Sequence, residues 1–191
     1  MSKPPRKRQR FPQLPVTAYD PYMLAVLWTG TPTTCLSHDS ALAAYEVCDT
    51  VTGIQQGAKG DGCQEGNAIE VRNSAGTGTP KVSVTGNTVG KYQKTGVLVK
   101  GQVSAVVTGN TISGYGPVGF IAQNGIQVSA GATAQVTGNT ISDNFYTPKS
   151  DVACGLILYH SDGVKLGDNT FSGNERNLCN ISRGGGTFDG F

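Results

Sequence analysis

The chain has 191 residues, of which 27 are glycine and only 15% are charged. This length allows one domain, and the glycine-rich, weakly charged composition favours a turn-rich β structure over a helical bundle or a disordered chain. The net charge of +2 arises from five basic residues among the first ten, which leave 10 basic against 13 acidic residues in the rest of the chain, and such a body argues against nucleic acid as the main partner.

The amino-terminal third contains no repeated pattern. Residues 1–35 are basic and proline-rich, which is more typical of a solvated, disordered tail than of a nucleic-acid arm. Met23–Trp28 is the longest apolar run there and is too short for a signal peptide or a membrane-spanning helix. Within a cap region at 36–66, Ser40–Cys48 could form a short helix that covers one end of a core.

A five-residue motif then recurs along the chain. Val-Thr-Gly-Asn-Thr occurs at Val84–Thr88, Val107–Thr111 and Val136–Thr140, and returns in altered form at Leu166–Thr170. The steps between its asparagines are 23, 29 and 30 residues, a period that is typical of solenoids. We therefore expect a solenoid over residues 67–182, followed by a glycine-rich tail at 183–191.

Two sets of short strands alternate in phase with this motif. Apolar residues occupy every second position before each Gly-Asn pair, so one face of each strand points to a shared core. A second set begins at residues 67, 95, 124 and 154 and forms another wall. The pattern predicts an all-β, parallel β-helix of four to five coils, about 20–25 Å tall. The alternative is an antiparallel sandwich in which Gly-Asn marks hairpin turns.

Stacked coils bring equivalent residues about 4.8 Å apart, so that their side chains can hydrogen-bond along the stack. The motif asparagines therefore predict a ladder of Asn87, Asn110, Asn139 and Asn169. Glycine before each of the first three suits a corner with positive φ, and Asp168 tolerates the same geometry.

These residues resemble a known family. The repeated motif, Asp61–Cys63, Tyr92–Val97 and Ile121–Ser129 are similar to secreted bacterial right-handed parallel β-helix proteins, which share the pectate-lyase fold. The resemblance covers residues 51–182 and implies an extracellular or cell-surface location. It does not specify a reaction, because the same fold occurs in lyases, hydrolases, epimerases and uncharacterised surface proteins.

The five cysteines have no metal-binding spacing, so zinc is not expected. In an exported protein, disulfides among Cys35, Cys48 and Cys63 could attach the amino-terminal region to the coil. Cys154 opens a core strand and is expected to pack there.

The outward columns beside the second strand set are the place to look for function. They bring together a polar group that could bind an acidic sugar and transfer a proton. The alternative is an ordinary solvated sheet face. The candidate residues are Arg72, Lys100, Gln127, Tyr159, His160 and Asp162.

Tyrosines follow the ladder asparagines at nearly constant spacing. Tyr92, Tyr115 and Tyr146 could stack as a platform for sugar rings, or could cover the edge of the coil.

The pattern favours a non-catalytic module that binds a polysaccharide. The carboxylate pairs of glycosidases and the clustered acids of a calcium site are absent, so no cofactor is expected, although calcium stays possible. The alternatives are a lyase or epimerase on uronate polymers, with Lys100 or His160 as base and Tyr159 as acid, and a structural spacer without a ligand. Nothing in the sequence indicates the oligomeric state.

Overall fold

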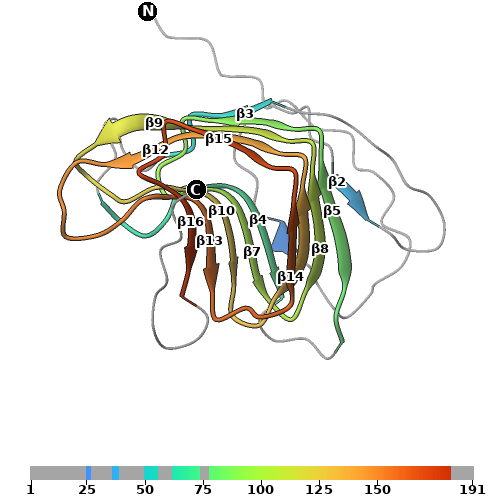
Figure 1. Cartoon of the computed structure of the whole chain (residues 1–191). Coiled ribbons are helices and arrows are strands. Elements are labelled where there is room, and N and C mark those ends of the chain that lie inside the picture. Colours follow the sequence, from blue (N-terminus) through green and yellow to red (C-terminus); the bar gives the residue numbers. More distant parts are fainter. Residues whose placement is uncertain (1–24, 27–35, 39–49, 56–61, 74–77, 182–191) are drawn as a thin grey trace, which may run out of the picture.

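The computed structural model describes residues 25–26, 36–38, 50–55, 62–73 and 78–181, and in these residues every regular element is a β-strand. Three sheets wind around one core (Figure 1). Sheet A contains, in order, β1 (Ala25–Val26), β4 (Asn67–Asn73), β7 (Thr95–Gly101), β10 (Asn124–Ser129), β13 (Cys154–Tyr159) and β16 (Arg176–Asn180). Sheet B contains β14 (Val164–Gly167), β11 (Thr133–Thr137), β8 (Ser104–Thr108), β5 (Lys81–Thr85) and β2 (Leu36–His38). Sheet C contains β15 (Thr170–Ser172), β12 (Thr140–Tyr146), β9 (Thr111–Val118), β6 (Thr88–Gly90) and β3 (Thr50–Thr52).

Strands that neighbour each other in a sheet come from successive coils and run parallel. In sheet A, Ile126 pairs with Val97 on one side and with Leu156 on the other. The exceptions are β1 and β2, which pair antiparallel with β4 and β5 at the amino-terminal end of the stack. The parallel β-helix is therefore confirmed, and the antiparallel sandwich is wrong.

The core is the aliphatic interior of the coil. Inward residues of all three sheets meet there, as the period-two pattern predicts. The residues of this core that are completely buried include Val71, Val84, Val97, Val99, Val107, Ile112, Ile126, Val136, Ile141 and Leu156. In the last coil the same orientation gives less burial: Leu166 is 42% exposed, whereas Val136, one coil earlier, is 0% exposed. Because β14 is the last described strand of sheet B, no strand that the structure describes covers Leu166 on that side.

The predicted asparagine ladder is present at the corner between sheets B and C. The Oδ1 atom of Asn110 accepts hydrogen bonds from the backbone N and the Nδ2 of Asn87, at 2.9 and 2.8 Å. Asn110 donates in turn to Asn139 Oδ1, and Asn139 donates to Asn169 Oδ1. The asparagine Oδ1 at each corner thus accepts a hydrogen bond from the backbone N–H of the asparagine in the preceding coil. The residues that precede the ladder have positive φ, as predicted: Gly86, Gly109, Gly138 and Asp168.

Some predictions fall on parts of the chain that the structure does not describe. The cap helix at Ser40–Cys48 and the glycine-rich tail at 183–191 lie outside the described residues, and so does the basic tail at 1–35 apart from Ala25–Val26, which form β1.

We predict that Asn110→Ala lowers the free energy of unfolding by about 3 kcal/mol or more, because each buried polar group left without a partner costs about 1–3 kcal/mol. Asn110 is 1% exposed and also donates to Val84 O at 2.9 Å. Asn169→Ala is the matched control, because Asn169 is half-buried at the end of the ladder and water can replace part of its bonds. Urea unfolding measures both losses, and equal losses would contradict a role for burial.

Candidate functional site

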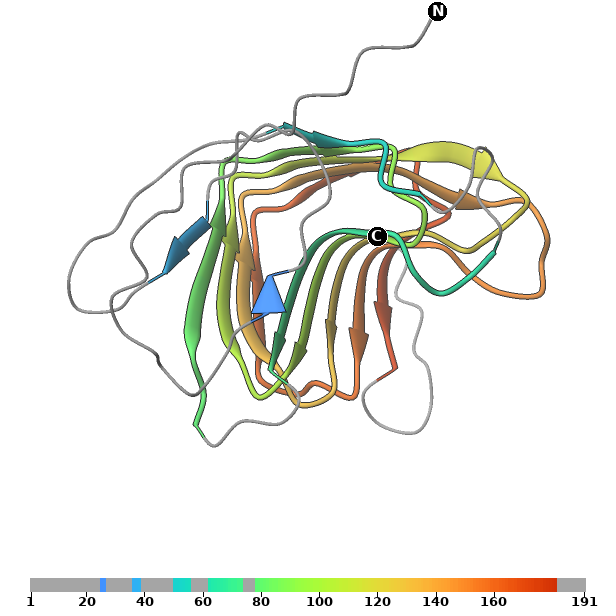
Figure 2. The ribbon, with the colours of Figure 1, turned by 180° about the vertical axis from the view of Figure 1, so that it is seen from behind.

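The outward face of sheet A is concave. Its strands curve along their length (Figure 2). Side chains three residues apart on one strand come into contact. Asn67 Nδ2 donates to Glu70 Oε2 at 2.9 Å in β4, and Asn124 Nδ2 lies 3.4 Å from Gln127 Oε1 in β10. The two contacts occur at equivalent positions of different coils, so the concavity runs along the stack.

A groove of about 640 Å³ occupies part of this concavity. Its floor comes from β10, β13 and the residue after β16. Its walls come from the end of β12 and from the connections that precede β4, β7, β10 and β13. The groove therefore extends over several coils. The lining residues are Gly62, Gln64, Lys94, Phe120, Ile121, Ala122, Asn124, Gln127, Tyr146, Ser150, Asp151, Val152, Cys154, Ile157, Tyr159 and Ile181.

Lys94 is the lysine of this groove, and it is largely withdrawn from solvent. Its Nζ donates to the backbone oxygen of Ala122 at 2.8 Å. Burial lowers the pKa of the Lys94 ammonium, and the negative charge of Asp151 opposes this effect only in part. A second negative group in the groove would stabilise the charged form.

Two tyrosines present their rings to the same space. Tyr159, at the end of β13, is 45% exposed, and its ring meets the His160 ring edge to face with centroids 4.4 Å apart. Tyr146, at the end of β12, is half-buried. Together with Ile157, these side chains add apolar surface beside the amide groups of Asn124 and Gln127.

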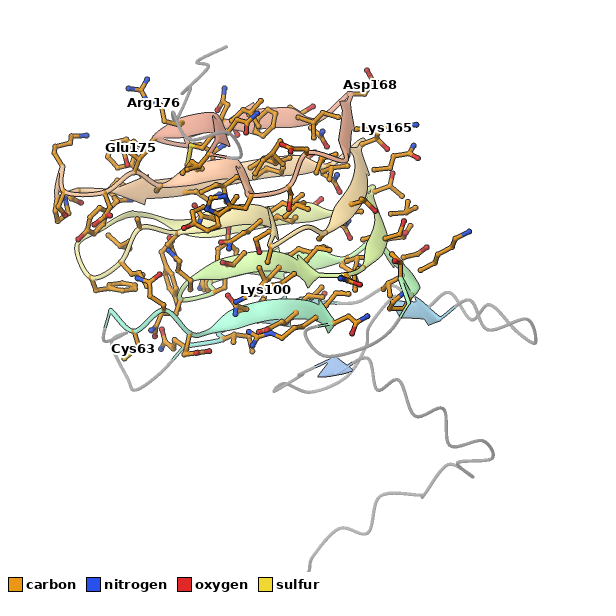
Figure 3. All side chains as sticks on the ribbon, turned by 90° about the horizontal axis from the view of Figure 1, so that it is seen from below. Cys63, Lys100, Lys165, Asp168, Glu175 and Arg176 are labelled. Carbon is orange, nitrogen blue, oxygen red and sulfur yellow. A yellow bond between two sulfur atoms is a disulfide. The ribbon has the colours of Figure 1, made fainter. Side chains whose placement is uncertain are left out.

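The predicted column beside sheet A exists, but only its last member lies in the groove. Arg72 pairs with Lys100, Lys100 with Ser129, and Ser129 with Tyr159. Arg72 forms an ion pair with Glu70, which is buried, so its charge is largely compensated within the protein. Lys100 lies towards the other end of the stack from the last coil (Figure 3).

Of the predicted binding residues, Gln127, Tyr146 and Tyr159 line the groove. His160 and Asp162 are exposed beyond β13 and are not among the lining residues.

The prediction that Tyr92 binds sugar rings is wrong. Its side chain is 0% exposed, and its hydroxyl donates to Asn144 Oδ1 at 2.5 Å. Burial raises the pKa of this phenol far above its ordinary value, although the bond to Asn144 works in the opposite direction. Gly96 lies against this ring: a Cβ there would be 3.0 Å from Tyr92 Cε1 and 2.6 Å from both Gly125 O and Ile112 Cγ2.

Tyr115 is 37% exposed but lies outside the groove lining. Its hydroxyl donates to Gln55 Oε1 at 2.8 Å, and its ring packs against Phe120, which does line the groove. The three tyrosines therefore have three different environments and do not form one platform.

A second asparagine ladder was not predicted. Asn144 donates from its backbone N and its Nδ2 to Asn174 Oδ1, at 3.1 and 2.9 Å. Asn174 Nδ2 donates to Ile141 O at 2.9 Å. The sequence contains a signal for this second ladder, because Asn144 and Asn174 each follow an asparagine of the first ladder by five positions.

A disulfide joins Cys154 of β13 to Cys179 of β16, with the two Cα atoms 6.1 Å apart. Cys154 is buried, as predicted, but it lines the groove rather than the core and is bonded to Cys179, which is buried as well. Cys35 and Cys48 lie outside the described residues, and Cys63 is exposed. The proposed pairings among these three stay predictions.

Two further observations concern the residues that the structure describes. No three His, Cys, Asp or Glu side chains among them converge as a metal site would require. No helix among them is long and apolar enough to span a membrane.

A family model described as a right-handed beta helix region matches residues 67–188. The chain belongs to this right-handed β-helix family. No curated protein and no solved structure matched the chain. Family membership thus establishes the coil and its hand, whereas the chemistry has to be argued from the groove.

We predict that Lys94 makes stability depend on pH. Its folded-state pKa lies below the ordinary value of 10.5, so between these two values the unfolded chain binds more protons and the free energy of unfolding rises with pH. Lys94→Met removes this contribution. The difference in unfolding free energy, wild type minus Lys94→Met, should increase as the pH rises from 7 towards 10, measured by urea unfolding. A constant difference would show that Lys94 is not desolvated.

Proposed function

We propose that the protein binds an elongated carbohydrate chain along the groove of sheet A without cleaving it. The observation that carries this proposal is the groove itself, whose lining comes from successive coils and so follows the axis of the stack. A linear polymer has the shape that such a surface accommodates. The concavity provides contact from the floor and from the walls.

The lining chemistry suits a sugar. Carbohydrates present hydroxyl groups at their edges and C–H groups on their faces, so a binding site needs polar groups beside flat apolar surface. Asn124 and Gln127 supply amides, and Lys94 supplies an ammonium. The rings of Tyr146 and Tyr159 offer apolar area together with a polar tip.

The groove has too few carboxylates for glycosidic hydrolysis. Glycosidases use two carboxyl groups that flank the scissile bond, about 5–10 Å apart. Among the lining residues, Asp151 is the single carboxylate. Binding without cleavage therefore accounts for the residues that are present.

We also propose an extracellular or cell-surface location. Disulfides persist in oxidising compartments and are rare in the cytosol. The Cys154–Cys179 bond lies next to the groove and joins the last two strands of sheet A, so it belongs to the folded structure. The same argument favours a polysaccharide met outside the cell.

We predict that a polysaccharide from a panel of neutral, uronate-containing and sulfated polymers binds, and that Tyr159→Ala and Gln127→Ala each weaken binding about tenfold, equivalent to about 1.4 kcal/mol. Calorimetry measures the affinity. Val106→Ala removes an exposed apolar side chain of sheet B and serves as the control that leaves it unchanged.

The Lys100→Ala variant distinguishes binding in the groove from binding on the neighbouring column of Arg72 and Lys100. Lys100 does not line the groove, so this variant should retain full affinity. A large loss would move the ligand onto the column of Arg72 and Lys100. A folded protein that binds no polymer of the panel would favour the structural spacer.

A lyase acting on uronate polymers is the second candidate, favoured by the lowered pKa of Lys94 beside two phenols. A neutral amine can abstract the C5 proton of a uronate. The electron pair then forms the C4–C5 double bond and expels the C4 oxygen, which takes a proton from a phenol such as Tyr159. Lys94 replaces Lys100 and His160 as the base in this scheme, because neither lines the groove.

We predict for this candidate an ultraviolet-absorbing unsaturated product from pectate, alginate or a glycosaminoglycan, lost in Lys94→Gln. The assay is run with and without calcium. If absorbance stays flat with every polymer while one of them binds, the groove is a binding site only.

A further inference from the structure

One wall of the groove is the connection between β12 and β13, residues 147–153. Ser150, Asp151 and Val152 of this connection face the groove, and Tyr146 immediately precedes it. Residues 147–151 are exposed, so the wall has few contacts with the coil through its own side chains. The contacts that hold residues 147–153 in place therefore determine the shape of the groove.

The two ends of this wall are bound by one carboxylate. Glu175 Oε2 accepts hydrogen bonds from the backbone N–H of Tyr146 at 3.3 Å and of Ala153 at 3.1 Å. Glu175 Oε1 forms an ion pair with Lys149 Nζ at 3.2 Å. The Glu175 side chain is 11% exposed, whereas that of Lys149 is 73% exposed, so the backbone contacts are the protected ones.

Glu175 does not line the groove but belongs to the last coil (Figure 3). Its own backbone N donates to Asn144 O at 2.8 Å, and the next residue, Arg176, donates to Ala153 O at 3.2 Å. Arg176 opens β16, which the Cys154–Cys179 bond ties to β13. The carboxylate is thus supported by the stack on both sides.

We propose that Glu175 is the positioning residue of the groove: it latches the wall 147–153 at both ends and so sets the place of Tyr146 and Asp151. Charge-assisted hydrogen bonds to backbone N–H groups are stronger than neutral ones, and here they join residues that the repeat itself does not connect. The expected effect of Glu175 on ligand affinity rests on the proposed function. The contacts by which Glu175 holds the wall do not depend on that function.

The test uses the single lysine of the wall as a reporter. Proteolysis is faster where the chain leaves its folded position, so trypsin cleavage after Lys149 should accelerate when the wall is released. Mass spectrometry compares this cut with cuts after Lys81 and Lys100 on the coil. Glu175→Ala should accelerate cleavage at Lys149 about tenfold or more, without a change at the two coil lysines. Glu175→Gln keeps an oxygen acceptor and should restore most of the protection. Glu65→Ala, which removes an exposed carboxylate near the other end of the coil, is the matched control.

Polysaccharide affinity provides the second readout. Glu175→Ala should weaken binding about tenfold, and Glu175→Gln should recover most of it. The proposal is overturned if cleavage at Lys149 is unchanged in Glu175→Ala, or if all three lysines become equally accessible, since that would be a general loss of stability. Absence of any binding polymer would contradict the proposed function alone, because the cleavage measurement needs no ligand.

Discussion

The architecture depends on one constraint: backbone N–H groups at a tight, buried corner need acceptors. Asparagine supplies them, because its Oδ1 receives both the backbone N–H and the Nδ2 of the asparagine one coil earlier. A shift of one residue would remove these bonds and turn inward side chains outward. The ladder therefore fixes the register of every coil, and with it the columns in which outward residues align.

The concavity of sheet A follows from close packing at a second place. Gly125 and its equivalents Gly96 and Gly155 have no room for a side chain: a Cβ on Gly125 would lie 2.4 Å from both Gly155 O and Ile141 Cγ2. The ladder of Asn144 and Asn174 occupies the space beside Gly125 and Gly155. Because sheets A and C approach so closely there, the strands of sheet A turn outward, and the side chains of Asn124 and Gln127 meet above the bend. The groove is thus a consequence of core packing.

The charged groups and the walls of the groove come from segments outside the repeat, whereas Asn124, Gln127 and Tyr159 belong to the repeat strands. Lys94 and residues 147–153 belong to connections between strands, and Glu175 fixes one of these connections from the last coil. Regular coils provide the floor, while connections of varied length provide charge and walls. This division is the physical reason that membership in the right-handed β-helix family specifies the scaffold and leaves the ligand open.

The sequence by itself determined the parallel coil, the ladder of Asn87 to Asn169 and the column that joins Arg72, Lys100 and Tyr159, because each follows from a repeat combined with period-two alternation. It misplaced Tyr92 and missed the Cys154–Cys179 bond. Only the tertiary structure decided those two features, the burial of Lys94 and the contacts of Glu175. These features depend on how far a strand bends or on which connection folds over a sheet. Such contacts join residues that are distant along the chain and produce no periodic pattern in the sequence.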